Sequence, residues 1–245
     1  MEDAKVPTPI APDDRRITIP LFTTRETARY VGVPASTMRN WIRGYAYPIH
    51  GGLGRAEPMV SSVEKSDPSK ATVPFIGLAE ALVIQAFKRE KLSIQKVRAA
   101  LDAIRREVAL EHALANKTVY TAGASILWDY ARRAGDAEIA QLVEPSSGQI
   151  VFTEPVSEYL QLIAYDANLW ASKIQLPAFQ PTRVVVDMKR GFGRPILDKQ
   201  RLPLDGILSR FAASEKISDI ARDLELDPTE VENVIRVAWR PAAAA

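Results

Sequence analysis

Arg39 and Asn40 are neighbouring residues whose side chains can each form a pair of hydrogen bonds. A guanidinium group matches the two acceptors that guanine presents in the major groove, and a carboxamide matches the acceptor and donor of adenine. The hydroxyls of Ser36 and Thr37 and the guanidinium of Arg43 suit phosphate oxygens. These residue types, gathered within eight positions, predict contact with double-stranded DNA.

Two short helices joined by a sharp turn are expected from Phe22 to Gly44, and they would position these side chains. Gly32 tolerates a left-handed backbone at the turn, and a proline two residues later suits the start of a helix. Met38 and Trp41 recur on one face of the second helix. In a helix-turn-helix they would pack inward, and Arg39 and its neighbours would face the groove.

Other interpretations of this segment remain open at this stage. A plain pair of packed helices has the same turn, and for Trp41 a core position is favoured over base stacking. The local charge favours DNA, because residues 15–60 hold only two acidic residues, Glu26 and Glu57, against seven arginines, Arg15, Arg16, Arg25, Arg29, Arg39, Arg43 and Arg55. Arg25 is therefore added to the expected DNA contacts.

A β-wing is expected between Tyr45 and Thr72, where glycine, proline and serine are frequent. Arg55 within it fits contact with phosphate or the minor groove, and fits a solvated loop charge equally well. After the wing, apolar spacing predicts two helices between Phe75 and Val108, with Ser93 as the cap of the second.

The pattern from Phe22 to Trp41 resembles the N-terminal domain of MerR-like winged-helix regulators and of the related excisionases. The resemblance extends over residues 17–108 and includes Leu92-Ser93-Ile94 at the start of a later helix. It implies a winged helix-turn-helix that binds operator DNA. The long dimerising coiled coil and the metal-binding cysteines of the MerR regulators are absent from this sequence, so metal or drug sensing is not implied.

The amino-acid composition narrows the classes of function that this protein can have. The chain has 245 residues, a net charge of +2 and no cysteine, which excludes disulfides, thiolate metal sites and cysteine nucleophiles. It holds two histidines outside any motif, and Gly191-x-Gly193 lacks the rest of a dinucleotide site. We therefore expect no enzyme activity, no cofactor and no metal. No apolar run is long enough to span a bilayer, so a cytoplasmic protein is expected.

The expected fold is mainly α with small β elements. It comprises a flexible arm (residues 1–16), a MerR-like winged helix domain (17–112), a connector with short helices and a strand (113–182), and a C-terminal domain (183–241). The last begins with a β-hairpin around residues 184–197 and continues with three helices, Leu204 to Ala212, Ile217 to Leu224 and Pro228 to Trp239.

Several motifs of the C-terminal domain are similar to a small domain of unknown function attached to many VapB-type antitoxins. They are Val184-Val185-Val186-Asp187, Gly191-Phe192-Gly193-Arg194-Pro195, Arg201-Leu202-Pro203-Leu204 and Ile217-Ser218-Asp219-Ile220-Ala221. The resemblance implies an antitoxin paired with a PIN-domain ribonuclease toxin. Such a nuclease keeps carboxylates and a divalent ion in its pocket, so basic or aromatic residues are the candidate contacts. These are Lys189, Arg190, Phe192 and Arg194, for which a solvated turn is an equal alternative.

The last two helices also look like a helix-turn-helix, but their acidic residues disfavour DNA. Their apolar face is expected to form a homodimer, as a palindromic DNA site requires, through Ile217, Ile220, Leu224, Val231, Val234 and Ile235. The sequence thus predicts a dimeric antitoxin that represses its own operon. The alternatives are a free-standing MerR-like repressor without a toxin and a structural scaffold.

Overall fold

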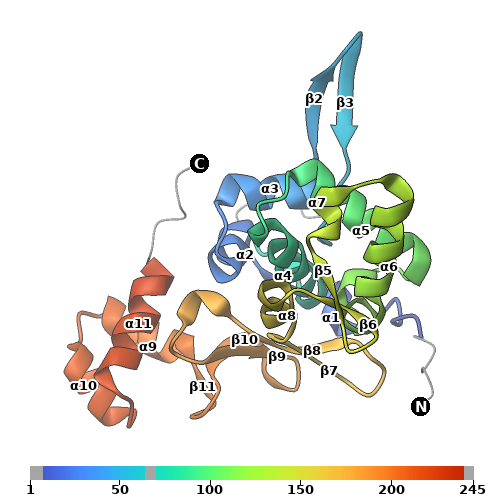
Figure 1. Ribbon diagram of the computed structural model, residues 1–245. Coiled ribbons are helices and arrows are strands. Elements are labelled where there is room, and N and C mark those ends of the chain that lie inside the picture. Colours follow the sequence, from blue (N-terminus) through green and yellow to red (C-terminus); the bar gives the residue numbers. More distant parts are fainter. Residues whose placement is uncertain (1–7, 64–69, 240–245) are drawn as a thin grey trace.

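The computed structural model describes residues 8–63 and 70–239. Helices form the upper body in Figure 1, a β-hairpin projects from that body, and a five-stranded sheet lies beneath it with three helices at one end. The chain is therefore a mixed helix and strand protein, with more strand than the mainly helical fold expected from the sequence. Within the described ranges, no helix is long and apolar enough to cross a membrane.

The helix-turn-helix is formed by α2 (Thr24–Val31) and α3 (Ala35–Arg43). Thr23 and Glu26 close a capping box at the start of α2, since each side chain accepts a hydrogen bond from the other's backbone N–H. Gly32 ends α2 with φ 80°, the left-handed conformation that glycine adopts most easily. Local sequence signals thus determine both ends of the first helix.

The segment before the helix-turn-helix differs from the flexible arm expected over residues 1–16. Residues 15–18 form a short helix, α1 (Arg15–Thr18), because the side chain of Asp14 accepts a hydrogen bond from the backbone N–H of Arg16. Only then does β1 (Pro20–Phe22) begin, and it pairs with β4 (Val73–Pro74). Residues 1–7 of the expected arm lie outside the described residues, whereas residues 8–16 pack on the body: the indole N–H of Trp170 donates to the carbonyl of Thr8.

The wing consists of β2 (Tyr45–Ile49) and β3 (Gly52–Ala56), a tight antiparallel hairpin that follows α3 after one residue. Figure 1 shows that it projects away from the helical body. The later part of the expected wing, residues 64–69, lies outside the described residues. Residues 59–63 return along the body toward β4.

The core is built around α4 (Phe75–Arg89), which is buried on nearly all sides. A helix this apolar can be stable only when neighbours cover its whole surface. It is followed by α5 (Ile94–Val108), whose N-cap is Ser93 as expected. The expected pair of helices between Phe75 and Val108 is thus present.

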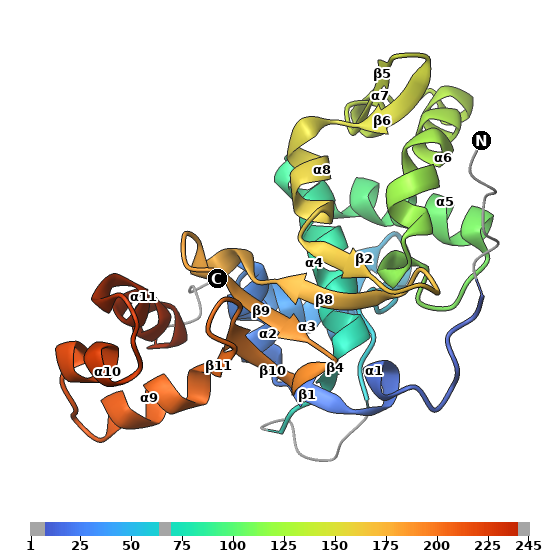
Figure 2. The ribbon, with the colours of Figure 1, turned by 90° about the horizontal axis from the view of Figure 1, so that it is seen from below.

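Residues 113–162, within the expected connector, hold more elements than the short helices and the strand expected there. They contain η1 (Ala113–Ala115), the long α6 (Thr118–Ala134), α7 (Ala137–Ala140), a hairpin of β5 (Val143–Ser146) and β6 (Gln149–Phe152), and α8 (Glu154–Leu160). Helix α6 packs on α5, and α8 packs on α4 (Figure 2). This part of the chain therefore belongs to the same core as the helix-turn-helix.

The main sheet is an antiparallel meander with strand order β11-β10-β9-β8-β7. Its strands are β7 (Ile163–Tyr165), β8 (Ala171–Gln175), β9 (Val184–Asp187), β10 (Arg190–Leu197) and β11 (Leu202–Pro203), with η2 (Pro177–Phe179) between β8 and β9. The expected hairpin is β9 and β10, but β8 pairs with β9 as well. The expected domain boundary between residues 182 and 183 therefore falls inside one sheet.

The three expected C-terminal helices are α9 (Leu204–Ala212), α10 (Ile217–Asp223) and α11 (Pro228–Trp239). The apolar face expected to form a dimer is mostly internal to this unit. Ile220, Val231, Val234 and Ile235 are buried within the protomer, where α9, α10 and α11 pack on one another. Only Ile217 and Leu224 of that set keep partial exposure, so most of this face stabilises the protomer itself.

Candidate nucleic-acid interface

Helix α3 separates buried from exposed side chains as its spacing predicts. Met38 is fully buried and Trp41 is 1% exposed, whereas Arg39, Asn40 and Arg43 are exposed. The core position of Trp41 excludes it from base stacking. Arg39 and Asn40, whose side chains each offer a pair of hydrogen-bonding groups, are therefore accessible to the base edges in a DNA groove.

The remaining expected contacts surround this surface. Ser36 and Thr37 are half-buried in the first turn of α3, and Arg25 is exposed in the first turn of α2. Arg43, at the end of α3, and Arg55, on the wing, line one groove of about 900 Å³ together with Thr24. Two guanidinium groups on one groove suit a phosphate backbone that passes between helix and wing.

The end of α3 is held by hydrogen bonds to the chain that returns from the wing. The carbonyl oxygen of Trp41 accepts from the backbone N–H of Met59 at 2.7 Å and of Val60 at 3.1 Å. Gly44 lies between helix and wing with φ 68°, and a Cβ there would overlap the carbonyl of Ala56. Glycine is therefore required at this junction.

Two arginines of α5 fix the base of the wing, and sequence reasoning missed both. Arg98 donates to the carbonyl of Glu57 at 2.6 Å, and its guanidinium lies 5.7 Å from the ring centroid of Tyr45. Arg105 donates to the carbonyl of Met59 at 2.8 Å. No local pattern marks such a role, because the acceptors are more than forty residues away in the sequence.

A buried polar cluster supports the segment after the wing. Glu80, only 2% exposed, accepts a hydrogen bond from the backbone N–H of Ser61 at 2.6 Å. Nδ1 of His112 lies 2.8 Å from Oγ of Ser61 and 3.3 Å from Oε1 of Glu80. Burial opposes a charge on the imidazole, but the hydrogen bond and charge of Glu80 raise the pKa of His112 above its ordinary value.

Arg16 does not contribute to the DNA-facing positive charge that the sequence suggests. Its guanidinium forms ion pairs at 2.7 Å with both Asp14 and Asp166, and all three side chains are largely covered. Burial disfavours the charge of Asp14, yet the hydrogen bonds from Arg16 hold the pKa of that carboxyl below its usual value. Arg16 therefore joins the N-terminal segment to the loop between β7 and β8.

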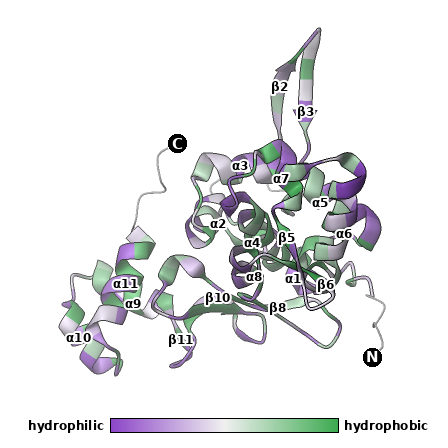
Figure 3. Ribbon diagram, viewed as in Figure 1, coloured by the Kyte–Doolittle hydropathy of each residue, from purple (hydrophilic) through white to green (hydrophobic). Residues whose placement is uncertain are grey.

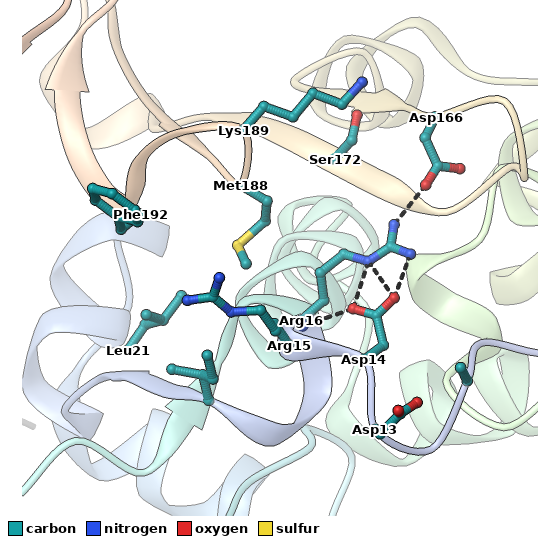
Figure 4. A pocket seen from close by; sticks show the side chains of 12 residues that line it. Asp13, Asp14, Arg15, Arg16, Leu21, Asp166, Ser172, Met188, Lys189 and Phe192 are labelled. Carbon is teal, nitrogen blue, oxygen red and sulfur yellow. Dashed lines mark hydrogen bonds and ion pairs between the residues drawn. The ribbon is translucent and has the colours of Figure 1, made fainter.

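The candidate toxin contacts lie at the turn between β9 and β10. Phe192 is 82% exposed, Lys189 and Arg190 are exposed, and Arg194 pairs with Asp205 at 2.9 Å. Figure 4 shows Phe192 and Lys189 at one wall of a cleft of about 520 Å³, opposite the N-terminal segment 11–21. Sequence reasoning anticipated the turn but missed the opposite wall of the cleft.

Aromatic packing joins the helix-turn-helix to η2, the short helix between β8 and β9. Tyr30 of α2 packs edge-on against Phe22, with ring centroids 5.8 Å apart, and lies 6.0 Å from Phe179 of η2. Asn233 of α11 is buried and donates to the carbonyl of Phe179 and to Oγ1 of Thr182. Helix α2, η2 and α11 are thus in contact across the interior.

This chain is similar to known proteins in the helix-turn-helix segment and over nearly its whole length. Residues 20–101 match the family model described as "Putative DNA-binding HTH domain". The chain is 34% identical over 226 residues, 90% of its length and 94% of the other protein, to "Putative antitoxin VapB45" of Mycobacterium tuberculosis (strain ATCC 25618 / H37Rv). It is similar in structure to the crystal structure of Rv2018 from Mycobacterium tuberculosis, with a TM-score of 0.74, 32% identity, and 90% of this chain and 99% of that chain covered.

The matched segment begins in β1, contains both helices of the helix-turn-helix and ends in α5. The identity to the antitoxin, in contrast, extends over nearly the whole of both chains. The chain has an exposed polar surface on α3, matches a DNA-binding helix-turn-helix domain and is similar to an antitoxin over nearly its full length. It therefore belongs to the VapB-type antitoxins that carry a DNA-binding helix-turn-helix.

Proposed function

We propose that this protein is the antitoxin of a type II toxin-antitoxin pair, which neutralises a PIN-domain ribonuclease and represses its own operon as a dimer. The observation that carries the proposal is the orientation of α3 in a chain related along its length to an antitoxin. Arg39, Asn40 and Arg43 are exposed on that helix, while Met38 and Trp41 are buried.

Binding to operator DNA is supported by the position of the cations. Base-edge contact is assigned to Arg39 and Asn40, and phosphate contact to Ser36, Thr37, Arg25, Arg43 and Arg55. Arg43 and Arg55 line the same groove, as phosphate contact from both requires. A dimer would place two such surfaces on the half-sites of a palindromic operator.

The dimer contact is proposed to involve the outer surface of the C-terminal unit rather than its buried face. Ile217 and Leu224 remain partly exposed, and Trp239 is 51% exposed beside Phe211, with ring centroids 5.2 Å apart. Apolar side chains on an outer surface are available to a second copy, whereas those inside the protomer are not.

Toxin contact is proposed at the turn between β9 and β10. Lys189, Arg190 and Arg194 provide cations that suit the carboxylate-lined pocket of a PIN ribonuclease, and Phe192 provides an exposed aromatic ring. Three residues next to this turn, at the irregular start of β10, adopt positive φ: Gly191, Phe192 and Gly193. That geometry holds the ring out of the sheet and into solvent.

Co-expression with the product of the adjacent gene tests the toxin proposal. We expect a stable complex in which ribonuclease activity is suppressed. Phe192→Ala and Lys189→Glu should weaken the complex, whereas Lys199→Glu, an exposed lysine at the next turn of the same sheet, should leave it intact. If no neighbouring gene product binds and DNA binding persists, the free-standing repressor is the better description. If the protein binds neither a neighbouring gene product nor DNA, the antitoxin proposal and the repressor proposal are both wrong.

A further inference from the structure

The tip of the wing carries exposed apolar side chains that the helix-turn-helix does not explain. Tyr47 is 42% exposed, Ile49 51% and Leu53 75%. They are three of the six large hydrophobic side chains exposed in residues 8–63 and 70–239. Figure 3 shows hydrophobic colour on this hairpin, which projects from the helical body. Exposed apolar groups gathered at one place mark a contact surface.

Both faces of the hairpin tip are apolar. Tyr47 and Ile49 lie on one face, because a Cβ at Gly54 would stand 2.8 Å from the Tyr47 ring and 3.1 Å from Cγ2 of Ile49. Leu53 pairs with Pro48, so these two residues lie on the opposite face. A phosphate-binding wing would instead present cations at its tip.

The tip is also narrow. Gly52 faces Ile49 and Gly54 faces Tyr47 across the two strands, so β3 adds no side-chain bulk on that face. The connecting residues are His50 and Gly51, the tightest connection that a hairpin uses. The result is a thin apolar wedge with aliphatic groups on both sides.

Arginines flank this wedge at its base, whereas its tip, residues 47–54, holds neither lysine nor arginine and carries His50 in its turn. Arg55 is 73% exposed on the strand that leaves the tip, and Arg43 lies on the same groove at the end of α3. One residue, Gly44, separates α3 from the wing. A duplex docked on α3 would therefore place its backbone against these arginines and its next groove against the wedge.

We propose that the wing tip inserts Ile49 and Leu53 into the minor groove of the bound DNA and bends the duplex there. Proteins that bend DNA from the minor groove place apolar side chains between base steps and nearby arginines on the phosphates. The narrow, apolar tip matches the first requirement, and Arg43 and Arg55 match the second. The inference rests on the proposed DNA-binding function and adds a contact that does not depend on base-edge hydrogen bonds.

The test uses the full-length protein and the DNA directly upstream of its own gene. Affinity is measured by fluorescence anisotropy at several salt concentrations, and bending by energy transfer between dyes at the DNA ends. Ile49→Thr/Leu53→Ser removes the wedge while keeping a β-branched residue at position 49. Ile49→Val/Leu53→Met keeps an apolar tip. Tyr120→Gln, an exposed aromatic on α6, controls for the loss of surface hydrophobicity.

We expect the polar double variant to lose the bend and to bind about tenfold more weakly, the loss that follows when a Leu side chain is no longer buried. Its salt dependence should be unchanged, since no phosphate contact is removed. The apolar double variant and Tyr120→Gln should behave as wild type. Thermal melts of all variants should coincide, because the substituted side chains are exposed.

Other outcomes would overturn the proposal in different ways. If the polar double variant binds and bends the DNA as wild type does, the wedge is wrong and the DNA-binding function stands. If that variant instead loses self-association in sedimentation while the bend is retained, the tip contacts a second copy of the chain. If the wild-type protein does not bind this DNA at all, the proposed function fails and the wedge fails with it.

Discussion

Gly44 and Ala56 approach each other so closely that a Cβ on the glycine would overlap the carbonyl oxygen of the alanine. This contact joins the end of α3 to the last residue of the wing. Gly44→Ala also forces a left-handed backbone, at φ 68°, on a residue with a side chain. We expect a loss of roughly 1–3 kcal/mol in the free energy of unfolding, measured by urea denaturation.

Gly52→Ala is the matched control for this junction. It lies in β3 of the adjoining wing, and a Cβ there would meet no atom within 4 Å. Its free energy of unfolding should stay within about 1 kcal/mol of wild type, the range of an ordinary glycine substitution in a strand. Equal losses at Gly44 and Gly52 would contradict the importance of the close approach.

Arg39→Ala should weaken binding to the upstream DNA by about 1–3 kcal/mol, the discrimination that one bidentate base contact supplies. Because the contact is to a base edge, the loss should be larger on specific than on unrelated DNA. Arg132→Ala removes an exposed arginine from α6 and serves as the charge control. Competition anisotropy with both DNAs measures the difference, and unchanged affinity for Arg39→Ala would exclude α3 as the recognition helix.

His112 predicts a pH dependence of stability. Its pKa is raised in the folded protein above the ordinary 6.5, so protonation stabilises the native state. That contribution is fully present below pH 6.5 and is lost as the pH rises through the folded pKa. His112→Gln should therefore flatten the pH profile of the free energy of unfolding, measured by urea titrations.

His50→Gln is the control for that profile, because His50 is the other histidine and lies exposed at the wing turn. It should keep the wild-type slope. Glu80→Gln removes the charge that faces the imidazole from α4 and leaves burial to disfavour its protonation, so the wild-type slope should be lost or reversed. A slope that survives both substitutions would assign the dependence to other groups.

The buried hydrogen bonds of Asn233 are expected to stabilise the packing of α11 on the rest of the protein. It is 6% exposed, and its amide donates to the carbonyl of Phe179 and to Oγ1 of Thr182. Asn233→Ala leaves these buried acceptors without a donor, at a cost of about 1–3 kcal/mol. Hydrogen exchange should then rise in α9 to α11, while the exposed neighbour Glu232→Ala should leave exchange unchanged.

Several parts of this protein could be predicted from local sequence alone. The turn at Gly32, the burial of Trp41 beside the exposed Arg39, and the N-cap at Ser93 all follow from residues a few positions apart. Helix periodicity and capping are local, so the bounds of α2, α3, α9 and α11 lie within a few residues of those expected. For the same reason, residue spacing alone predicts the polar face of α3.

Other features were decided only by the tertiary structure. Arg16 reaches Asp166 across 150 positions of sequence, which turns an expected arm into a packed segment and withdraws one arginine from the DNA surface. Strands β7 and β8 carry short, weak patterns and pair with each other, and β8 also pairs with β9, which lies beyond the expected boundary. The apolar face of α11 serves the protomer because α9 and α10 cover it. Pairing and burial depend on distant neighbours, so chain folding, rather than residue spacing, decides them.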